Sequence, residues 1–389
     1  GHDEKKDGAY NIFYMGVNAG AFIGIMLCGW VGEKIGWSFG FGLAGIFMFL
    51  GMLQFYFAQP LFGNLGDKPI KVKNNTDNVA ASDDTIKIAN KLNHFSIIDY
   101  LLIGIFTISA IIFIINDPLS KIGDIQTFNF TIAGLPDSLF FALLSAITFV
   151  LLLIIRIPRY VAIERDRMIA FSIFCIFTIF FWAAFEQAAG SLPIYTRDYT
   201  NRFLEGNAAT TFKIVDLIVT IVPLGVITYV LLSLFRKTFS RIGLSNIILG
   251  FSFVIVWAIV LYKVFVEFQS TETEVPITWF AILNSLFIII FAPLFTKWWD
   301  SKYNPPASVK YFLGLLLLGL GFGFLAFGAK DVVLGSQTAS LSMAWLVFAY
   351  LFHTLGEMCL SPMGLSYLSK LIPARMIAFM FGVYYLAIA

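Results

Sequence analysis

The sequence predicts an all-α polytopic membrane protein. Of its 389 residues, 59% are hydrophobic, 13% are charged and 43 are phenylalanine. The mean hydropathy is +0.83, which is more apolar than one soluble core can accommodate. The formal net charge is only +2, and Lys and Arg are spread over short loops. We therefore expect a lipid bilayer as the main partner and no nucleic-acid partner.

The membrane spans follow from runs of apolar residues. Crossing about 30 Å of hydrocarbon takes about 20 helical residues. Eleven candidate spans meet this requirement, the last one incomplete: 10–30, 38–59, 97–116, 136–157, 167–190, 214–235, 243–264, 277–297, 310–329, 340–363 and 374–389.

Positive charge predicts the orientation of these spans. If they alternate across the bilayer, one set of loops holds 19 of the 26 Lys and Arg residues. This set comprises the N-terminal tail, 60–96, 156–167, 236–242, 297–310 and 366–375. By the positive-inside rule these loops are cytoplasmic. The helix that carries Glu186 then runs outward, and the helix that carries Glu357 runs inward.

Cysteines and histidines give no sign of a disulfide framework or a metal site. Cys28, Cys175 and Cys359 lie within or at the end of apolar segments, where packing is the simplest role. The three histidines lie in unrelated segments. No phosphate-binding loop or nucleophile elbow stands out, so we expect neither covalent catalysis nor a bound cofactor.

Two carboxylates, Glu186 and Glu357, lie within predicted membrane helices. An ionisable group costs about 2.5 kcal/mol or more at the bilayer centre, so each needs a function or a partner. Trp182 lies four residues before Glu186 and so on the same helix face. A carboxylate beside an aromatic wall can hold and release a proton, as a relay requires. The alternative is a permanent interhelical salt bridge.

Glu357 belongs to a polar stripe. His353, Glu357 and Ser361 recur every four residues, and Pro362 follows. Proline weakens helical hydrogen bonding, so this stripe is expected to face a cavity. The alternative is a satisfied polar cluster between helices. For His353 alone, the interpretation is a core histidine.

Asn18 and Asn284 are lone amides in apolar runs. A buried amide in lipid must hydrogen-bond either a neighbouring helix or a ligand. Near Asn18, glycines at 16, 20 and 24 form a small-residue ridge that favours close helix packing.

Four segments resemble motifs of proton-dependent oligopeptide transporters, the peptide branch of the major facilitator superfamily. FYMGVNAGAF at 13–22 resembles the signature of the family's fifth helix, and FWAAFEQ at 181–187 resembles that of the seventh. LNSLF at 283–287 and GEMCLSPMGLS at 356–366 are similar to motifs of the eighth and tenth helices. The motifs occur in the family's order and cover most of the chain.

The resemblance implies roles for individual residues. Asn18 and Asn284 would bind the peptide backbone and carboxylate, and Glu357 would hold the peptide amino terminus. Glu186 would be the proton-linked carboxylate of the C-terminal bundle. Trp182 and Tyr384 would line side-chain pockets, although relatives often carry Trp where Tyr384 stands. Ser361 would add a polar contact near Glu357.

The resemblance also implies a partial major facilitator fold of about 11 transmembrane helices, without the first four helices and the C-terminal end. Residues 1–59 would be helices five and six of the N-terminal bundle, 60–96 a cytoplasmic linker and 97–157 a linker helix pair. Residues 158–389 would be helices seven to eleven of the C-terminal bundle, with an inserted helix pair at 214–264.

The expected function is proton-coupled symport of di- and tripeptides by alternating access, in the inner (plasma) membrane of a bacterium. The proton gradient would drive transport without a cofactor, and the protein would be a monomer rather than an enzyme. The alternatives are a related carrier of an amino acid, nitrate or another small solute, and a membrane scaffold that transports nothing. An intramembrane enzyme would need a nucleophile and a base, and only Ser361 lies near Glu357.

Overall fold

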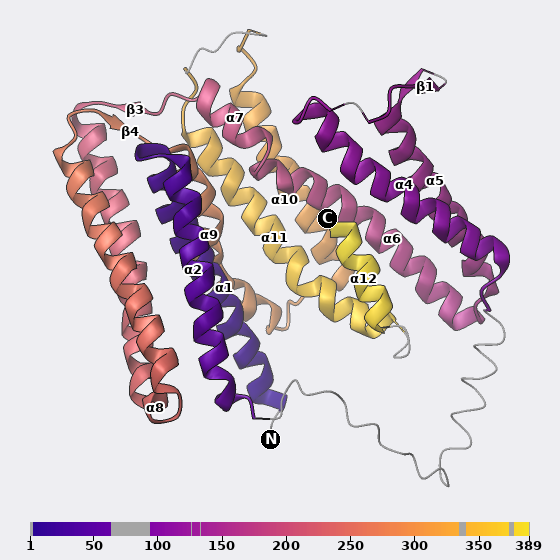
Figure 1. The fold of residues 1–389 in the computed structure, drawn as a ribbon, viewed down its shortest axis with the longest axis horizontal. Coiled ribbons are helices and arrows are strands. Elements are labelled where there is room, and N and C mark those ends of the chain that lie inside the picture. The colour runs from indigo at the N-terminus through magenta and orange to yellow at the C-terminus, as the bar shows by residue number, and fades with distance from the viewer. Residues whose placement is uncertain are drawn as a thin grey trace. The chain divides into compact units, whose positions relative to one another are not determined.

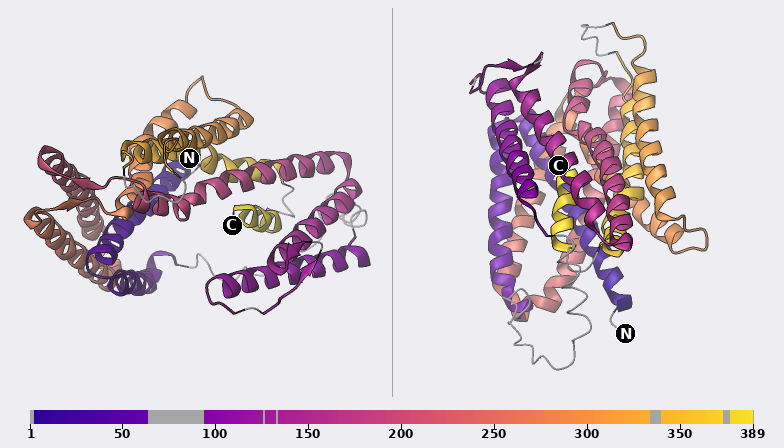
Figure 2. Two further views of the ribbon diagram at one scale, coloured as in Figure 1. Left: turned by 90° about the horizontal axis from the view of Figure 1, so that it is seen from above. Right: turned by 90° about the vertical axis from the view of Figure 1, so that its right-hand side faces the viewer.

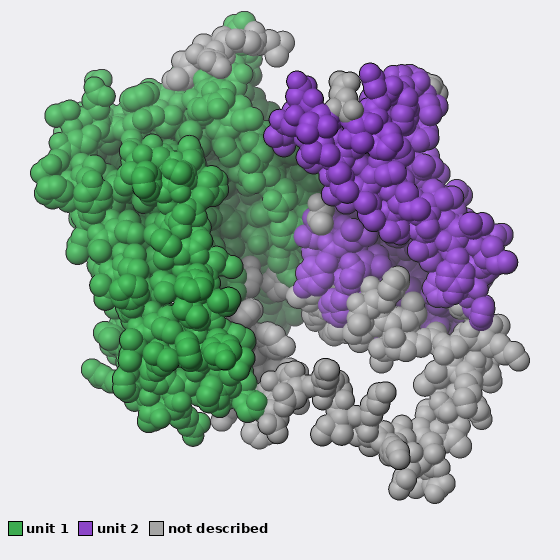
Figure 3. Space-filling view, in the orientation of Figure 1, with its two compact units in different colours: residues 1–69, 180–366 green, residues 70–179, 367–389 purple. Residues whose placement is uncertain are grey.

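A computed structural model of the chain describes residues 3–63, 94–125, 127–132, 134–333, 340–372 and 377–388. The chain forms two compact units, which Figure 3 shows in separate colours. Unit 1 comprises residues 1–69 and 180–366, and unit 2 comprises residues 70–179 and 367–389. The predicted linker at 60–96 lies mostly outside the described residues.

Unit 1 contains most of the membrane helices (Figure 1). Its elements are α1 (Asp3–Lys34), α2 (Trp37–Ala58), the 3-10 turns η1 (Gln59–Leu61) and η3 (Glu186–Ala188), α7 (Ser191–Asp198), β3 (Phe203–Leu204), α8 (Gly206–Gln269), β4 (Thr273–Glu274), α9 (Ile277–Trp299), α10 (Ala307–Gly328) and most of α11 (Ala344–Leu371).

Unit 2 is built around a helix pair. Its elements are α4 (Ile97–Lys121), β1 (Thr131–Ile132), β2 (Leu135–Pro136), α5 (Asp137–Arg156), the 3-10 turn η2 (Ile157–Arg159), most of α6 (Ala162–Phe185) and α12 (Ile377–Ile388). The strands β1 and β2 form a two-residue antiparallel pair between α4 and α5.

The predicted all-α class is confirmed. Within the described ranges, nine helices are long and apolar enough to cross a membrane. The longest, α8, contains both predicted spans 214–235 and 243–264. They form two separate arms, because the backbone leaves helical geometry between them at Ile242 (φ −138°, ψ 49°). The two arms of α8 lie side by side in Figures 1 and 2. Helices of this kind satisfy their backbone hydrogen bonds internally, as lipid requires.

Short strands join the two ends of α8. Phe203 of β3 pairs with Glu274 of β4, and Leu204 pairs with Thr273, in antiparallel register. One strand immediately precedes α8 and the other follows it. The hairpin formed by α8 therefore begins and ends at the same place.

Two clusters of buried apolar side chains hold unit 1 together. One joins α1, both arms of α8 and α9 through Phe22, Met26, Leu27, Leu224, Val256, Val260 and Ile282. The other joins α7, α9, α10 and α11 through Leu192, Val275, Phe280, Leu283, Leu325, Leu346, Ala349 and Tyr350. Because α9 contributes to both clusters, it is the central helix of the unit.

Large apolar side chains also cover the outside of these helices. Phe180, Tyr229 and Val254 are each at least 65% exposed. Such surface would be unfavourable in water, but it matches a lipid environment, where the solvent is itself apolar. The exterior therefore agrees with a multi-pass membrane protein.

A charged cluster fixes the helix pair of unit 2. Asp99 in the first turn of α4 is fully buried, and it binds Arg156 at 3.1 Å and Arg159 at 2.7 Å. At the other end of the pair, the Asn116 amide donates to Asp137 at 2.9 Å. Polar contacts at both ends thus set the alignment of α4 against α5.

The predicted span at 167–190 is interrupted. Helix α6 ends at Phe185, and Glu186–Ala188 form a 3-10 turn before α7 begins at Ser191. Gly190 lies outside helical geometry (φ −102°, ψ −93°), a conformation that glycine adopts easily. Glu186 therefore lies just after α6 rather than inside it.

Candidate functional site

The centre of the candidate site is a hydrogen bond between two helices. On α9, the Asn284 side-chain amide donates from Nδ2 to Oε2 of Glu357 on α11, at 3.0 Å. Both side chains are half-buried. The sequence marked Asn284 and Glu357 separately as site residues, and the structure brings them into direct contact.

Thr354 completes this contact from α11. Its hydroxyl oxygen lies 3.2 Å from the same Asn284 Nδ2 atom and donates to the Tyr350 carbonyl at 2.7 Å. Thr354 is fully buried and lies three residues before Glu357, so both face the same side of the helix. Sequence analysis missed Thr354, because threonine commonly bonds back to its own helix.

Glu186 and Trp182 form a second part of the site. Trp182 packs edge-to-face against Phe181 and Phe185, with ring centroids 5.6 and 5.3 Å away. Glu186 follows directly and is exposed. It lies close enough to Glu357 for the two carboxylates to interact electrostatically. None of the described residues pairs with the Glu186 carboxylate.

Two buried polar atoms near these carboxylates have no hydrogen-bond partner among the described residues. They are Nε1 of Trp182 and the hydroxyl oxygen of Ser361. Buried polar atoms are normally satisfied, so such exceptions mark places where a ligand or water can bind. Both residues were predicted to lie at the substrate site.

His353 occupies a tightly packed position at the start of the predicted polar stripe. It is 2% exposed and its ring packs on Phe322, with centroids 4.5 Å apart. Neither ring nitrogen has a partner within the part of the chain that the structure describes. These contacts agree with the interpretation of His353 as a core residue.

Asn18 lies on α1, which packs antiparallel to α9. Gly29 of α1 contacts Thr278 near the start of α9. Phe22, about two turns earlier in α1, packs in the same buried cluster as Ile282, which lies later in α9. Asn18 is buried one further turn along α1, toward the level of Asn284. The glycine ridge beside it meets open space, because no described atom comes within 4 Å of a Cβ at Gly16, Gly20 or Gly24.

Tyr384 belongs to unit 2 rather than to the unit that holds the other predicted site residues. It is buried on α12 and stacks on Phe174 of α6, with ring centroids 5.9 Å apart. Its predicted role in a side-chain pocket stays a prediction.

A comparison with protein-family models decides the family. The model described as the POT family matches residues 1–261 and 256–389, which together cover the whole chain. The chain belongs to the POT family. The members of this family are membrane transporters and not enzymes. The match confirms the resemblance noted in the sequence.

Individual relatives agree with the family match. The POT-family chain is 27% identical over 392 residues to the peptide transporter YePEPT of Yersinia enterocolitica, covering 99% of this chain and 59% of the relative. It is 21% identical to dipeptide and tripeptide permease A of Cronobacter turicensis, covering 100% and 57%. The chain therefore spans less than two thirds of the length of these relatives.

Solved structures show the same fold. A crystal structure of a peptide transporter POT in complex with sulfate aligns with a TM-score of 0.55 at 26% identity. The alignment covers 99% of this chain and 60% of that one. A POT-family transporter in complex with 5-aminolevulinic acid aligns with a TM-score of 0.52 at 21% identity.

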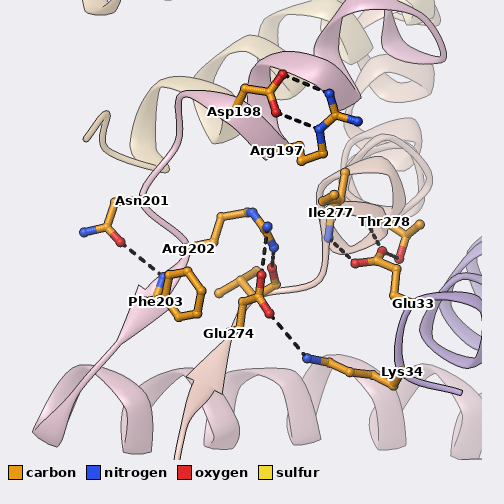
Figure 4. Close-up of polar contacts among 11 residues, drawn as sticks. Glu33, Lys34, Arg197, Asp198, Asn201, Arg202, Phe203, Glu274, Ile277 and Thr278 are labelled. Atoms are coloured by element: carbon orange, nitrogen blue, oxygen red, sulfur yellow. Dashed lines mark hydrogen bonds and ion pairs between the residues drawn. The ribbon is translucent and has the colours of Figure 1, made fainter. Parts of the chain in front are cut away.

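A polar network in the POT-family chain joins the end of α1 to the start of α9 and to the strands β3 and β4 (Figure 4). The Glu33 carboxylate at the end of α1 accepts hydrogen bonds from Ile277 and Thr278 at the start of α9. Arg202 binds Glu274 at 2.8 Å and the Val275 carbonyl at 2.7 Å. Sequence analysis missed this network, because charged residues at helix ends resemble ordinary loop residues.

A second group that the sequence did not reveal joins the two arms of α8. Asp216 on the first arm and Lys263 on the second form a buried ion pair. Lys263 also binds Glu267 at 3.1 Å, and the Trp279 indole of α9 donates to Asp216 at 3.1 Å. These residues hold the hairpin closed and attach it to α9.

Proposed function

We propose that the full-length protein is a proton-coupled symporter of di- and tripeptides that works by alternating access in the bacterial plasma membrane. The observation that carries the proposal is the contact between Asn284 and Glu357, where α9 meets α11. Membership of the POT family and similarity to peptide transporters support it.

The half-buried Glu357 carboxylate accounts for the substrate class. A peptide with a free amino terminus carries an ammonium group, and attraction between opposite charges is stronger where water is scarce. An anion such as nitrate would be repelled by the same carboxylate. Glu357 therefore favours peptides over the anionic substrates considered above.

Glu186 is the proposed proton-linked group. In our proposal, ionised Glu186 pairs with a basic residue elsewhere in the full-length protein, and protonation releases that partner. A charge that is paired in one bundle arrangement but not in the other biases the equilibrium between them. Proton entry would thereby drive alternation.

The remaining predicted residues complete the proposal. Trp182 and Tyr384 would line side-chain pockets, Ser361 would contact the substrate near Glu357, and Asn18 would bind the peptide backbone. Residues 1–59 would belong to the N-terminal bundle and 158–389 to the C-terminal bundle, with 214–264 inserted. The linker at 60–96 would be cytoplasmic. Because α2 crosses the membrane between α1 and this linker, α1 would end near the outer face.

Transport by the full-length protein in liposomes tests this function. A dipeptide should accumulate when the outside is more acidic than the inside, and Glu357→Ala should weaken dipeptide binding at least about 10-fold, the loss expected when a charged hydrogen-bond partner is removed. The control is Glu205→Gln, a carboxylate exposed between β3 and α8, which should leave uptake unchanged.

Other outcomes would favour the other functions. Proton-driven uptake of an amino acid or nitrate without uptake of dipeptides would identify a related carrier. A protein that shows neither flux nor a peptide-dependent thermal shift would be a scaffold. Unchanged affinity of Glu357→Ala for a free-amine dipeptide would remove Glu357 from the site.

A further inference from the structure

A cavity lies where the end of α1 meets the two ends of α8 and the strand β4 (Figure 1). Its volume is about 480 Å³. Trp30 of α1 and Phe212 and Val266 of the two α8 arms form its apolar wall, and the rest of its lining is polar or charged. Among the described residues, none of those assigned to the peptide or the proton lines it. The cavity is therefore separate from the candidate substrate site.

Two buried polar atoms at this cavity have no hydrogen-bond partner among the described residues. They are Nε1 of Trp30, a residue that is 2% exposed, and the hydroxyl oxygen of Thr273, a residue that is 7% exposed. Both residues line the cavity. An indole N–H can only donate, and a hydroxyl also has a hydrogen to give. Because buried polar atoms are normally satisfied, the lining offers two donors to a ligand that carries acceptor oxygens.

Two carboxylates of the lining already have cationic partners in the protein. Glu274 binds Arg202 at 2.8 Å and Lys34 at 3.8 Å, as Figure 4 shows. Glu267 binds the buried Lys263 at 3.1 Å. These two carboxylates therefore contribute little unbalanced negative charge to the cavity.

The lining also contains one cation and one anion that are not balanced in this way. The half-buried Lys213 donates to the Ser270 carbonyl at 2.8 Å, which leaves two of its three ammonium hydrogens for other acceptors. Glu272 is exposed. Neither Lys213 nor Glu272 forms an ion pair with any residue that the structure describes. An unpaired positive charge and an unpaired negative charge on one cavity match a ligand that carries both signs.

The surroundings of the cavity favour a lipid as this ligand. Tyr262, Phe265 and Phe268, near the end of the second α8 arm, are each more than half exposed. The polar segment 270–274 follows directly. Large aromatic side chains beside polar loops are typical of the depth at which lipid headgroups lie. At that depth a lipid can place its headgroup on the charges and its glycerol and acyl groups on the apolar wall.

We propose that this cavity binds the headgroup of a zwitterionic phospholipid of the phosphatidylethanolamine type. Its phosphate oxygens accept hydrogen bonds from the Trp30 indole, the Thr273 hydroxyl and the Lys213 ammonium. Its own ammonium group faces the Glu272 carboxylate. Because the cavity is lined by α1 and by both ends of α8, the bound lipid fastens the α8 hairpin to α1. This site is independent of the proposed transport function.

The test measures lipid binding to the full-length, delipidated protein in detergent by native mass spectrometry. Wild-type protein should bind one phosphatidylethanolamine at least about threefold more tightly than phosphatidylglycerol, which has the phosphate but no ammonium. Trp30→Phe keeps an aromatic ring and removes the N–H, so it should weaken binding of both lipids about fivefold to tenfold. Lys213→Gln should do the same. The matched control is Lys237→Gln, an exposed lysine near the turn between the α8 arms, which should bind as wild type does.

Glu272→Gln separates recognition of the ammonium from recognition of the phosphate. It should remove the preference for phosphatidylethanolamine and change the affinity for phosphatidylglycerol less than about twofold. A general structural effect would instead weaken both lipids equally, which would contradict the role of Glu272.

Several results would overturn the inference. Wild-type protein that binds both lipids equally well would exclude the zwitterionic preference, and wild-type affinity in both Trp30→Phe and Lys213→Gln would exclude this cavity. If Trp30→Phe does not fold, as judged by size-exclusion chromatography, Lys213→Gln decides alone. Displacement of the lipid by an equal concentration of glycerophosphoethanolamine, which lacks acyl chains, would assign the cavity to a soluble ligand. Displacement by alanyl-alanine would make it a second peptide site.

Discussion

Glu33 on α1 and Thr278 on α9 are joined by two hydrogen bonds. The Glu33 carboxylate accepts from the Thr278 backbone N–H at 2.8 Å and from its hydroxyl at 2.6 Å, and a third bond comes from the Ile277 N–H at 2.9 Å. The first N–H groups of a helix have no partner within the helix and attract negative charge. Glu33 thus caps a helix that, in our assignment, belongs to the opposite bundle.

Removing the charge of Glu33 should loosen this contact. We expect Glu33→Gln to lower the stability of the detergent-solubilised protein by about 1 kcal/mol, the usual effect of losing a helix cap, measured as a fall in thermal midpoint. Lys34→Gln is the matched control, because among the described residues Lys34 forms an ion pair only with Glu274, at 3.8 Å, and both side chains are partly exposed. A larger effect of Lys34→Gln would contradict the capping role.

The proposed proton role of Glu186 predicts separate effects on two transport assays. Glu186→Gln cannot gain or lose a proton, so uptake driven by a proton gradient should be abolished. Exchange of labelled for unlabelled dipeptide across the membrane needs no net proton movement and should continue. Both assays are carried out on Glu186→Gln in liposomes. Intact proton-driven uptake by the variant would exclude Glu186 as the coupling residue.

The packing of α10 against α11 predicts that a shift of the α11 backbone would disturb the proposed substrate site. A Cβ at Gly356 would lie 2.7 Å from the Gly314 carbonyl oxygen, and a backbone atom cannot easily move aside. Gly356→Ala should therefore displace α11 beside Glu357, lowering stability by about 1 to 3 kcal/mol and weakening dipeptide binding. Gly319→Ala, where no described atom lies within 4 Å, should have neither effect in the same thermal-shift and binding assays.

The ion pair between Asp216 and Lys263 in α8 predicts that a single variant loses more stability than the double variant. Lys263→Met would leave Asp216 buried without its counter-ion, which typically costs about 3 to 5 kcal/mol. The double variant with Asp216→Asn removes both charges and should be more stable than Lys263→Met alone. Chemical unfolding in detergent measures both. A double variant less stable than Lys263→Met would contradict the pairing. The exposed pair of Arg197 and Asp198 provides a control that should tolerate Arg197→Met.

The sequence predicted the helices well, because a run of about 20 apolar residues has the length that a helix needs to cross the hydrocarbon core. It also marked Asn284 and Glu357, since polar groups in such runs are costly. It could not predict that they touch, because helical periodicity shows which residues share a face but not which helices are neighbours. The same limit concealed the contact between Asp216 and Lys263.

Local geometry at helix ends was also beyond the sequence. Helix α6 ends at Phe185, before the 3-10 turn and the non-helical Gly190, yet the apolar residues on both sides of this break still fit a helical pattern. The pairing of β3 with β4 involves only two residues on each strand, too few for an alternating pattern to reveal.

The pairing of β3 with β4 has a consequence for how the α8 hairpin is attached to unit 1. Because Leu204 and Thr273 are directly opposite each other, their Cα atoms are about 5 Å apart, as antiparallel partners are. A short connection could therefore join the two strands directly if the residues between them were removed. Deletion of the whole α8 hairpin would leave the ends of the flanking segments next to each other.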